Sequence, residues 1–265
     1  MMEAPEYIFI KRRILKLTGV DLDCYKTLQV QRRLKTYLVR SGHPNWHHFF
    51  RAIQNDVVEL GKLKDYLTIN VSSFFRDLEK FEYLRESILP ELLRGHPRLR
   101  VWSAGCSHGH EPYSLAIVLA EAAGFYRQHH ILATDIDRSA LERAQAGGPY
   151  SADEVAKVPP PLLNRYFRTH DDGYYVVESL RRRITFRYHN LLADPFESGF
   201  DLIVCRNVVI YFTAEVKDRL YRRLHDALRP GGVLFMGGTE FVSKASAMGL
   251  EPAGISFYRR NNAER

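Results

Sequence analysis

Several features that would assign this sequence of 265 residues to a common class of protein are missing from it. Its three cysteines, Cys24, Cys106 and Cys205, share no metal-ligand spacing and form no even set for disulfides, which favours a reducing, cytoplasmic location. No apolar run approaches the roughly 20 residues that span a bilayer, and the N-terminus lacks the layout of a signal peptide, so we expect no direct membrane insertion.

Acidic residues are outnumbered, because 38 Lys and Arg against 31 Asp and Glu give a formal net charge of +7. The excess predicts an acidic partner, and the charge alone does not choose among nucleic acid, a membrane surface and an acidic protein. The sequence has no Lys/Arg-rich tail and no nucleic-acid-binding signature, which counts against nucleic acid. The segment from Cys24 to Arg40 contains no acidic residue, and its basic residues are Lys26, Arg32, Arg33, Lys35 and Arg40. On its charge pattern alone, this helix either faces an acidic partner or is a solvated charged face.

The first part of the chain, to about residue 98, is expected to be helical throughout. Asp21 and Asp23 are candidate N-caps for a helix that ends near Arg40. The apolar face of that helix consists of Val30, Leu34, Tyr37 and Leu38. Further helical segments cover roughly Trp46 to Asn55 and continue to Leu67.

From Leu99 onward, strand patterns alternate with helical ones. The expected strands are Leu99–Ser103, His130–Thr134, Ile184–Tyr188, Phe200–Cys205, Val233–Met236 and Ser256–Arg259. The expected helices are Pro112–Ala123, Arg138–Gln145 and Ala214–Leu228. This alternation predicts an α/β fold with a mostly parallel sheet covered on both faces. One insertion, from Tyr166 to Val177, reads as a small hairpin with a glycine turn.

The loop after the first expected strand is the first candidate ligand site. Gly105 and Gly109 let the backbone turn tightly and approach a ligand closely. Neither the NAD fingerprint G-x-G-x-x-G nor the phosphate-binding loop G-x-x-x-x-G-K-[ST] is present. Glu111 would repel a phosphate but attract a cation, so S-adenosylmethionine, with its ammonium and sulfonium groups, fits this loop. The alternative is that Glu111 only favours the start of a helix.

Polar residues also follow two later strands. Asp135 ends the second strand, where an acid accepts hydrogen bonds from ribose hydroxyls, and Asp137 is expected to cap the next helix. A capping role for both acids is the alternative. Arg206 and Asn207 follow a buried strand at the edge where ligands bind in open α/β sheets. Arg206 and Tyr211 are candidates to bind an acidic substrate. The alternatives are that Arg206 only extends its charged end to solvent along an apolar surface and that Tyr211 only packs in the core.

Two other segments allow more than one interpretation. Residues Thr68–Asp77 combine small polar residues, two aromatics and an arginine at an expected domain junction, where ligand sites are common. A helix cap with buried phenylalanines fits this segment equally well. His108 and His110 form an H-x-H with no third ligand at a suitable spacing, so no metal site is expected.

Five segments, in this order, resemble the CheR family, the chemotaxis methyltransferases that esterify glutamates on receptor proteins. They are Asn70–Asp77, Gly105–Ser114, Ala133–Asp137, His189–Leu192 and Cys205–Phe212. The resemblance implies a Rossmann-like S-adenosylmethionine-dependent methyltransferase domain at 76–265, an N-terminal helical domain at 1–75, and a small antiparallel β-subdomain inserted at about 150–183.

The resemblance also assigns residues. Positions that match the family's cofactor contacts are Asn70, Ser72, Arg76, Glu111, Asp135, Asn190, Leu191, Arg206 and Asn207. Gly105 lies in the loop between the first expected strand and Glu111, which we call the cofactor cradle. Arg206 and Tyr211 match positions linked with the substrate carboxylate, and the basic helix matches the receptor-facing helix. The family usually has a glutamate where this sequence has His110. A monomer is expected, with S-adenosylhomocysteine as the product of the cofactor.

The expected reaction is in-line methyl transfer to a glutamate carboxylate, which is already ionised at neutral pH because its pKa is near ~4.3. No general base is required. A strong pair between Arg206 and the carboxylate would stabilise the ground state more than the transition state, so we expect Arg206 and Tyr211 to orient it with modest hydrogen bonds. Two alternatives remain open: a methyltransferase of the same fold acting on another protein or on nucleic acid, and a non-catalytic adaptor that binds the cofactor.

Overall fold

The computed structural model describes residues 2–68, 72–124 and 129–262. The chain forms two compact units. One consists of Met1–Asn70 with Ile210–Lys217, and the other of Val71–Val209 with Asp218–Arg265.

The first unit is helical, as expected. It contains α1 (Ala4–Thr18), the 3₁₀ turn η1 (Leu22–Cys24), α2 (Thr27–Arg40), α3 (Trp46–Ile53) and α4 (Val57–Thr68). Three aromatic side chains of α3, Trp46, Phe49 and Phe50, are buried at the centre of its core. The predicted apolar face of α2 packs on this core, with Val30 and Leu34 buried and Tyr37 and Leu38 half-buried.

The start of α2 differs from the expectation. The Asp21 side chain accepts a hydrogen bond from the Asp23 backbone, so Asp21 caps η1 and neither aspartate caps α2. The backbone before α2 instead pairs with a distant segment: Lys26 N donates to Tyr211 O at 2.9 Å, and Thr213 N donates to Cys24 O at 3.1 Å. This pairing explains why Ile210–Lys217 belongs to the helical unit.

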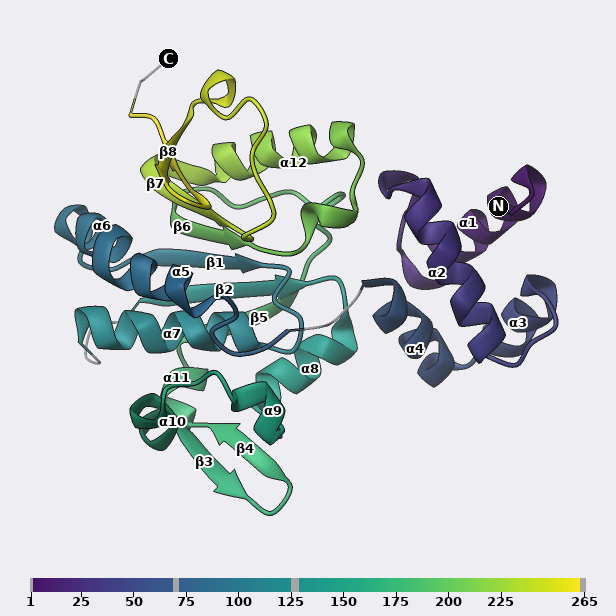
Figure 1. The fold of residues 1–265 in the computed structure, drawn as a ribbon, viewed down its shortest axis with the longest axis horizontal. Coiled ribbons are helices and arrows are strands. Elements are labelled where there is room, and N and C mark those ends of the chain that lie inside the picture. The colour runs from purple at the N-terminus through teal and green to yellow at the C-terminus, as the bar shows by residue number, and fades with distance from the viewer. Residues whose placement is uncertain (1, 69–71, 125–128, 263–265) are drawn as a thin grey trace. The chain divides into compact units, whose positions relative to one another are not determined.

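The second unit is built on a seven-stranded sheet with the order β5-β2-β1-β6-β7-β9-β8 (Figure 1). The strands are β1 (Arg100–Ala104), β2 (His130–Asp135), β5 (Ile184–Tyr188), β6 (Phe200–Cys205), β7 (Leu228–Met236), β8 (Leu250–Gly254) and β9 (Phe257–Arg260). The pairs among β5, β2, β1, β6 and β7 are parallel, whereas β9 and β8 run antiparallel. The expected mostly parallel sheet is therefore confirmed. All residues of β6 are buried, as a central strand covered on both faces requires.

The remaining helices connect and cover these strands. They are α5 (Leu78–Tyr83), the π-helical turn η2 (Leu84–Ile88), α6 (Leu89–Gly95), α7 (His110–Ala123), α8 (Arg138–Ala146), α9 (Ala152–Val155), α10 (Pro160–Tyr166), α11 (Glu178–Arg181) and α12 (Ala214–Ala227), with 3₁₀ turns η3 (Val209–Tyr211) and η4 (Ser246–Met248). Helix α7 is buried along most of its length, which makes it the main packing partner of the sheet.

The expected hairpin is present. Strands β3 (Phe167–His170) and β4 (Gly173–Val176) pair antiparallel and form a separate two-stranded sheet. Figure 1 shows this hairpin projecting from the large sheet, with α9, α10 and α11 at its base. Isolated backbone pairing between Tyr150 and Tyr174 joins the hairpin to the segment that precedes α9.

Two strand assignments differ from the sequence prediction. Strand β7 begins at Leu228, where the end of α12 was expected, and it continues through the Pro230–Gly232 turn signal. Strand β8 was not predicted, because Leu250–Gly254 is short, lacks an alternating pattern and contains Pro252.

Candidate functional site

The carboxyl ends of the parallel strands meet at one edge of the sheet. The register pairs Ala104 with Thr134, Asp135 with Tyr188, and Cys205 with Met236. The residues that directly follow these strands therefore lie along the same edge, and they include Gly105, Ile136, His189, Arg206 and Gly237. Ligands of open α/β sheets bind at this edge.

The loop after β1 is tightly closed onto β2. Gly105 has a φ of +87°, and a Cβ at this position would lie 2.5 Å from Cγ2 of Val208, so only glycine fits. Gly105 N donates to Thr134 O at 2.8 Å, and Ser107 N donates to the Asp135 carboxylate at 2.8 Å. The loop thus brings the predicted Gly105 and Asp135 together.

Glu111 lies in the first turn of α7, where its carboxylate is shielded from solvent. Oε1 accepts a hydrogen bond from Ser103 Oγ at 2.8 Å, and Oε2 lies 3.6 Å from Nη1 of Arg206. Burial raises the pKa of Glu111, while the charge of Arg206 and the bond from Ser103 oppose that rise. A cation bound beside Glu111 would further favour its ionised form.

Arg206 is almost wholly buried, with 2% of its side chain exposed. Its Nη2 donates to Asp77 at 2.6 Å and to the backbone oxygen of Arg76 at 2.9 Å. The guanidinium also lies over the ring of Phe235, with its carbon 4.7 Å from the centroid. The structure therefore brings the predicted Arg206, Arg76 and Glu111 together and adds Asp77, which sequence reasoning had placed only inside a motif.

Asn207 adopts a left-handed conformation, with φ of +60°, and is held there by a buried acid. Glu240 accepts hydrogen bonds from the backbone nitrogens of Asn207 at 2.7 Å, Gly237 at 2.9 Å and Val209 at 3.1 Å. Burial raises the pKa of Glu240 in opposition to these three bonds. Glu240 was not predicted as a site residue, and its only signal was an acid shortly after β7.

The two aspartates after β2 have separate roles. Asp137 accepts from the backbone nitrogens of Ser139 and Ala140 and caps α8, as predicted. Asp135 is buried, and its oxygens accept from Ser107 N at 2.8 Å and Asp137 N at 2.9 Å. Burial raises the pKa of Asp135 against those bonds. Each carboxylate oxygen can accept more than one hydrogen bond. The geometry of Asp135 is therefore compatible both with capping the local turn and with accepting hydrogen bonds from a ligand.

The other predicted residues lie as follows. Asn190 Oδ1 accepts from Leu192 N at 2.9 Å, which forms the turn after β5, and Leu191 is buried in it. Ser72 is half-buried, and Asn70 lies outside the described residues. Tyr211 belongs to the helical unit, where it is half-buried.

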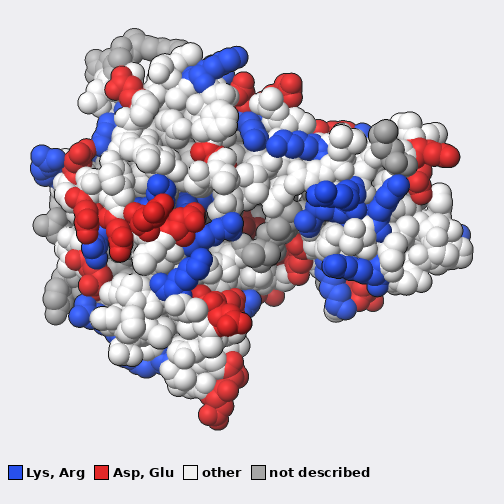
Figure 2. All heavy atoms as spheres, in the orientation of Figure 1, with Lys and Arg blue, Asp and Glu red and all other residues white. Residues whose placement is uncertain are grey.

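The basic residues of α2 and its N-terminal flank do not form one uniform surface. Lys26, Arg32, Lys35 and Arg40 are exposed, and Figure 2 shows basic side chains gathered over α2. Arg33 is half-buried instead: it donates to the backbone oxygen of Tyr66, and its guanidinium carbon lies 4.5 Å from the centroid of that ring. Arg33 is therefore used largely inside the helical unit.

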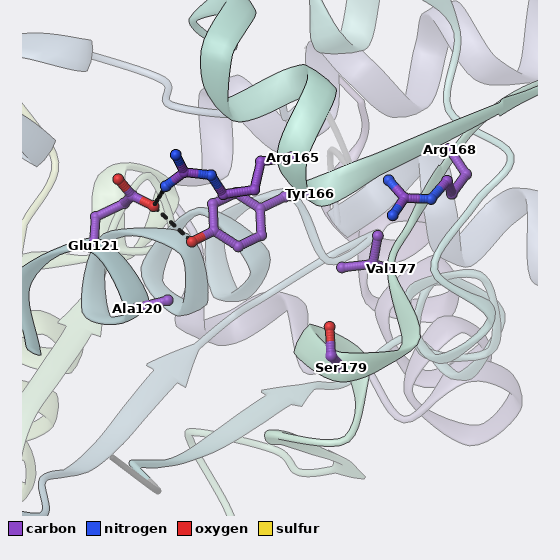
Figure 3. A pocket seen from close by; sticks show the side chains of 7 residues that line it. All are labelled: Ala120, Glu121, Arg165, Tyr166, Arg168, Val177 and Ser179. Carbon is purple, nitrogen blue, oxygen red and sulfur yellow. Dashed lines mark hydrogen bonds and ion pairs between the residues drawn. The ribbon is translucent and has the colours of Figure 1, made fainter. Parts of the chain in front are cut away.

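A separate hollow of about 430 Å³ lies between α7 and the base of the hairpin (Figure 3). Arg165 and Tyr166 both point at Glu121 and donate to one of its oxygens, at 2.7 and 2.6 Å. Arg168 and Ser179 contribute to its wall, and none of the predicted site residues that the structure describes lines it. This hollow is not part of the candidate site.

Within the described residues, no helix combines the length and the apolar character needed to cross a membrane.

Residues 5–68 match the family described as CheR methyltransferase, all-alpha domain, and residues 70–252 match CheR methyltransferase, SAM binding domain.

Full-length relatives agree with these matches. The chain is 40% identical over 254 residues to the chemotaxis protein methyltransferase of Listeria monocytogenes, with 96% of both chains covered. It is 37% identical over 242 residues to chemotaxis protein methyltransferase 1 of Pseudomonas aeruginosa, with 86% of this chain and 87% of that one covered. The chain belongs to the CheR family of chemotaxis methyltransferases and comprises its all-alpha and S-adenosylmethionine-binding domains.

Proposed function

We propose that the protein transfers a methyl group from S-adenosylmethionine to glutamate side-chain carboxylates of chemotaxis receptors, giving glutamate methyl esters and S-adenosylhomocysteine. The observation that carries the proposal is the contact of half-buried Glu111, with 12% of its side chain exposed, with buried Arg206 at the carboxyl edge of the sheet. This contact supports the proposal because an anion suited to a cationic donor lies beside a cation suited to an anionic acceptor. The names of the relatives support a chemotaxis substrate.

The residues at this edge fit the cofactor. Glu111 offers a carboxylate whose pKa burial raises although Arg206 lies 3.6 Å away, so a second cation, such as the ammonium of the cofactor, would further favour its ionised form. Asp135 offers acceptor capacity for ribose hydroxyls, and a side chain at Gly105 would fill the cradle between them. When bound, the cofactor supplies an electrophilic methyl group on a sulfonium, which becomes a neutral thioether as the carboxylate oxygen takes the methyl.

Arg206 is suited to orienting an acceptor carboxylate without binding it too strongly. Opposite charges disappear as the methyl moves, so a strong ion pair would favour the separated charges of the ground state. Asp77, at 2.6 Å, and Glu111, at 3.6 Å, already share the charge of Arg206. Arg206 is therefore left able to give modest hydrogen bonds. The same role for Tyr211, which belongs to the helical unit, stays a prediction from the sequence.

The receptor-facing surface would be the exposed basic set of Lys26, Arg32, Lys35 and Arg40. A segment that contains methylatable glutamates is necessarily acidic, and complementary charge steers association. The proposal places this reaction in the cytoplasm, with the protein acting as a monomer on the cytoplasmic part of the receptor.

The test is methyl transfer from tritium-labelled S-adenosylmethionine to receptor-enriched membranes. We expect label in the receptor band with the natural protein and a loss of at least about a hundredfold with Glu111→Gln, which removes the anion for the donor. Label in nucleic acid, or binding of the cofactor with no transfer to any receptor preparation, would overturn the proposal.

A further inference from the structure

The first turn of α7 contains Glu111 but lacks the usual means of fixing a helix start. Gly109 is the N-cap, has φ of +91°, and has no side chain to cap the helix. A cofactor-binding carboxylate in such a turn needs other contacts to hold its position, because misplacement by a fraction of an ångström weakens binding. His110, the residue beside Glu111, supplies such a contact.

The His110 ring is 1% exposed, and its Nε2 lies 2.9 Å from Oε1 of Glu154. Burial lowers the pKa of His110 to about 4, against the opposing charge of Glu154, so the ring is neutral at physiological pH. An ionised carboxylate can only accept, so Nε2 carries the proton and donates to Glu154. The ring packs between Phe74 and Tyr150, with centroid distances of 4.9 and 5.0 Å.

Glu154 is itself rigidly held. Both of its oxygens accept from Nη2 of Arg143, at 3.0 and 2.9 Å, and Oε2 also accepts from Ser151 N at 2.8 Å. Ser151 and Glu154 form a capping box at the start of α9. Glu154 is therefore a fixed acceptor at the base of the hairpin.

The same stretch of chain contacts the cofactor loop a second time. The Tyr150 hydroxyl donates to His108 O at 2.8 Å, while the Tyr150 backbone pairs with Tyr174 in β4. Two hydrogen bonds, from His110 and to His108, thus connect the loop and first turn of α7 to residues 150–154.

We propose that His110 is a positioning residue for the cofactor: its hydrogen bond to Glu154 fixes the first turn of α7 and thereby the place of the Glu111 carboxylate. The inference rests on the proposed cofactor role of Glu111 and adds a residue that does not touch the ligand. The competing explanation is that His110 only fills space between Phe74 and Tyr150.

The experiment measures the Kd for S-adenosylhomocysteine by calorimetry in four single variants and in the double variant His110→Leu with Glu154→Ala, together with their melting temperatures. His110→Leu fills the space without a donor, whereas His110→Gln keeps an N–H that can reach Glu154. Glu154→Ala removes the acceptor. His225→Leu is the matched control, because His225 Nδ1 makes a bond of the same 2.9 Å length to Asp226 far from the cradle.

We expect His110→Leu and Glu154→Ala each to raise the Kd about tenfold, the loss of one hydrogen bond to a charged group, and the double variant to be no weaker than either. His110→Gln should stay within about threefold of the natural protein, and His225→Leu should leave the Kd unchanged.

If the Kd of His110→Leu equals that of the natural protein, whatever its melting temperature, His110 only fills space between Phe74 and Tyr150, and the proposal is overturned. Additive losses in the double variant would overturn it as well. Should His110→Leu fail to fold, Glu154→Ala and His110→Gln decide the question. If the natural protein itself fails to bind S-adenosylhomocysteine, the proposed function fails, which is a separate result.

Discussion

Asp77 holds Nη2 of Arg206 at a distance of 2.6 Å, although 129 residues separate the two in the sequence. Asp77 has 41% of its side chain exposed, whereas Arg206 has 2%. The exposed partner can therefore be changed with little effect on packing, while the charge balance of the buried one changes.

The first prediction concerns that balance. Asp77→Asn leaves the Arg206 charge less compensated, so the guanidinium should bind an acceptor carboxylate more strongly in the ground state. We expect the KM for the receptor and kcat both to fall, each by several-fold, because added ground-state binding does not lower the barrier. Steady-state methylation kinetics measure both constants, and Asp77→Glu is the charge-preserving control. A higher KM in Asp77→Asn would contradict this account of Arg206.

Glu240 accepts three backbone N–H groups in a buried setting, so its removal should have a large effect. Glu240→Gln turns one acceptor oxygen into an amide donor that faces those N–H groups. We expect the free energy of unfolding to fall by about 2–3 kcal/mol and S-adenosylhomocysteine binding to weaken, because the Asn207 loop loses its support. Urea unfolding and calorimetry measure the two effects. An unchanged unfolding curve would show that the loop does not depend on Glu240.

Gly105 provides a steric test of the cradle. Gly105→Ala puts a methyl group where Val208 Cγ2 would be 2.5 Å away, at a φ of +87°. We expect cofactor affinity to fall more than about tenfold. Val208→Ala in the same chain should restore part of the loss by removing the clash. Gly61→Ala in α4, where a Cβ meets no atom of the described residues within 4 Å, is the matched control and should be neutral or slightly stabilising. If Val208→Ala does not restore cofactor affinity, the loss in Gly105→Ala comes from the strained backbone alone and not from the clash with Val208.

The His110 pKa predicts how stability depends on pH. The folded pKa is about 4 and the ordinary value is 6.5, so the unfolded chain takes up a proton first as the pH falls. Neutral His110 therefore makes its full contribution to the free energy of unfolding above pH 6.5, and this contribution is lost as the pH falls toward 4. The loss in the free energy of unfolding is at most about 3 kcal/mol.

Groups around the His110 ring modify this loss: Glu154 raises its pKa, whereas His108 and Arg143 lower it. Chemical denaturation at a series of pH values should show a smaller acid loss in His110→Leu than in the natural protein. Parallel curves for the natural protein and His110→Leu would contradict the low pKa.

The basic surface of α2 predicts an effect on the receptor alone. Arg32→Glu with Lys35→Glu reverses two exposed charges and should raise the receptor KM at least about tenfold while leaving the S-adenosylhomocysteine Kd unchanged. Arg33 is left in place because it packs on Tyr66. Arg12→Glu with Lys16→Glu makes the same change in charge at exposed positions of α1 and serves as the control. An equal rise of the receptor KM in both double variants would indicate that receptor binding depends on the net charge of the protein and not on the basic surface of α2.

Sequence patterns predicted the elements whose signal is local. Strands β5 and β6 begin and end at the predicted residues, because continuous or alternating apolar runs bounded by turns mark them clearly. Asp137 was correctly identified as the cap of α8 for the same reason. Strand β8 was missed because edge pairing with β9, and not an apolar pattern, makes it a strand.

The site could be predicted only in part. Motifs predicted Glu111, Asp135 and Arg206 as candidate site residues, roles that stay predictions, and the parallel order of the strands explains why they share an edge. The supporting partners could not be found, since Asp77 meets Arg206, Glu154 meets His110 and Glu240 meets Asn207 only after the chain has folded. The internal use of Arg33 is likewise invisible in the charge pattern of α2.

The central claim is that the acceptor is a glutamate carboxylate of a receptor. Its most direct test is mass mapping of receptor peptides after incubation with the protein and S-adenosylmethionine. The account predicts a gain of one CH₂ on a glutamate side chain, released as methanol by mild alkali. A methyl group that resists alkali, or one placed on any residue other than glutamate, would contradict it.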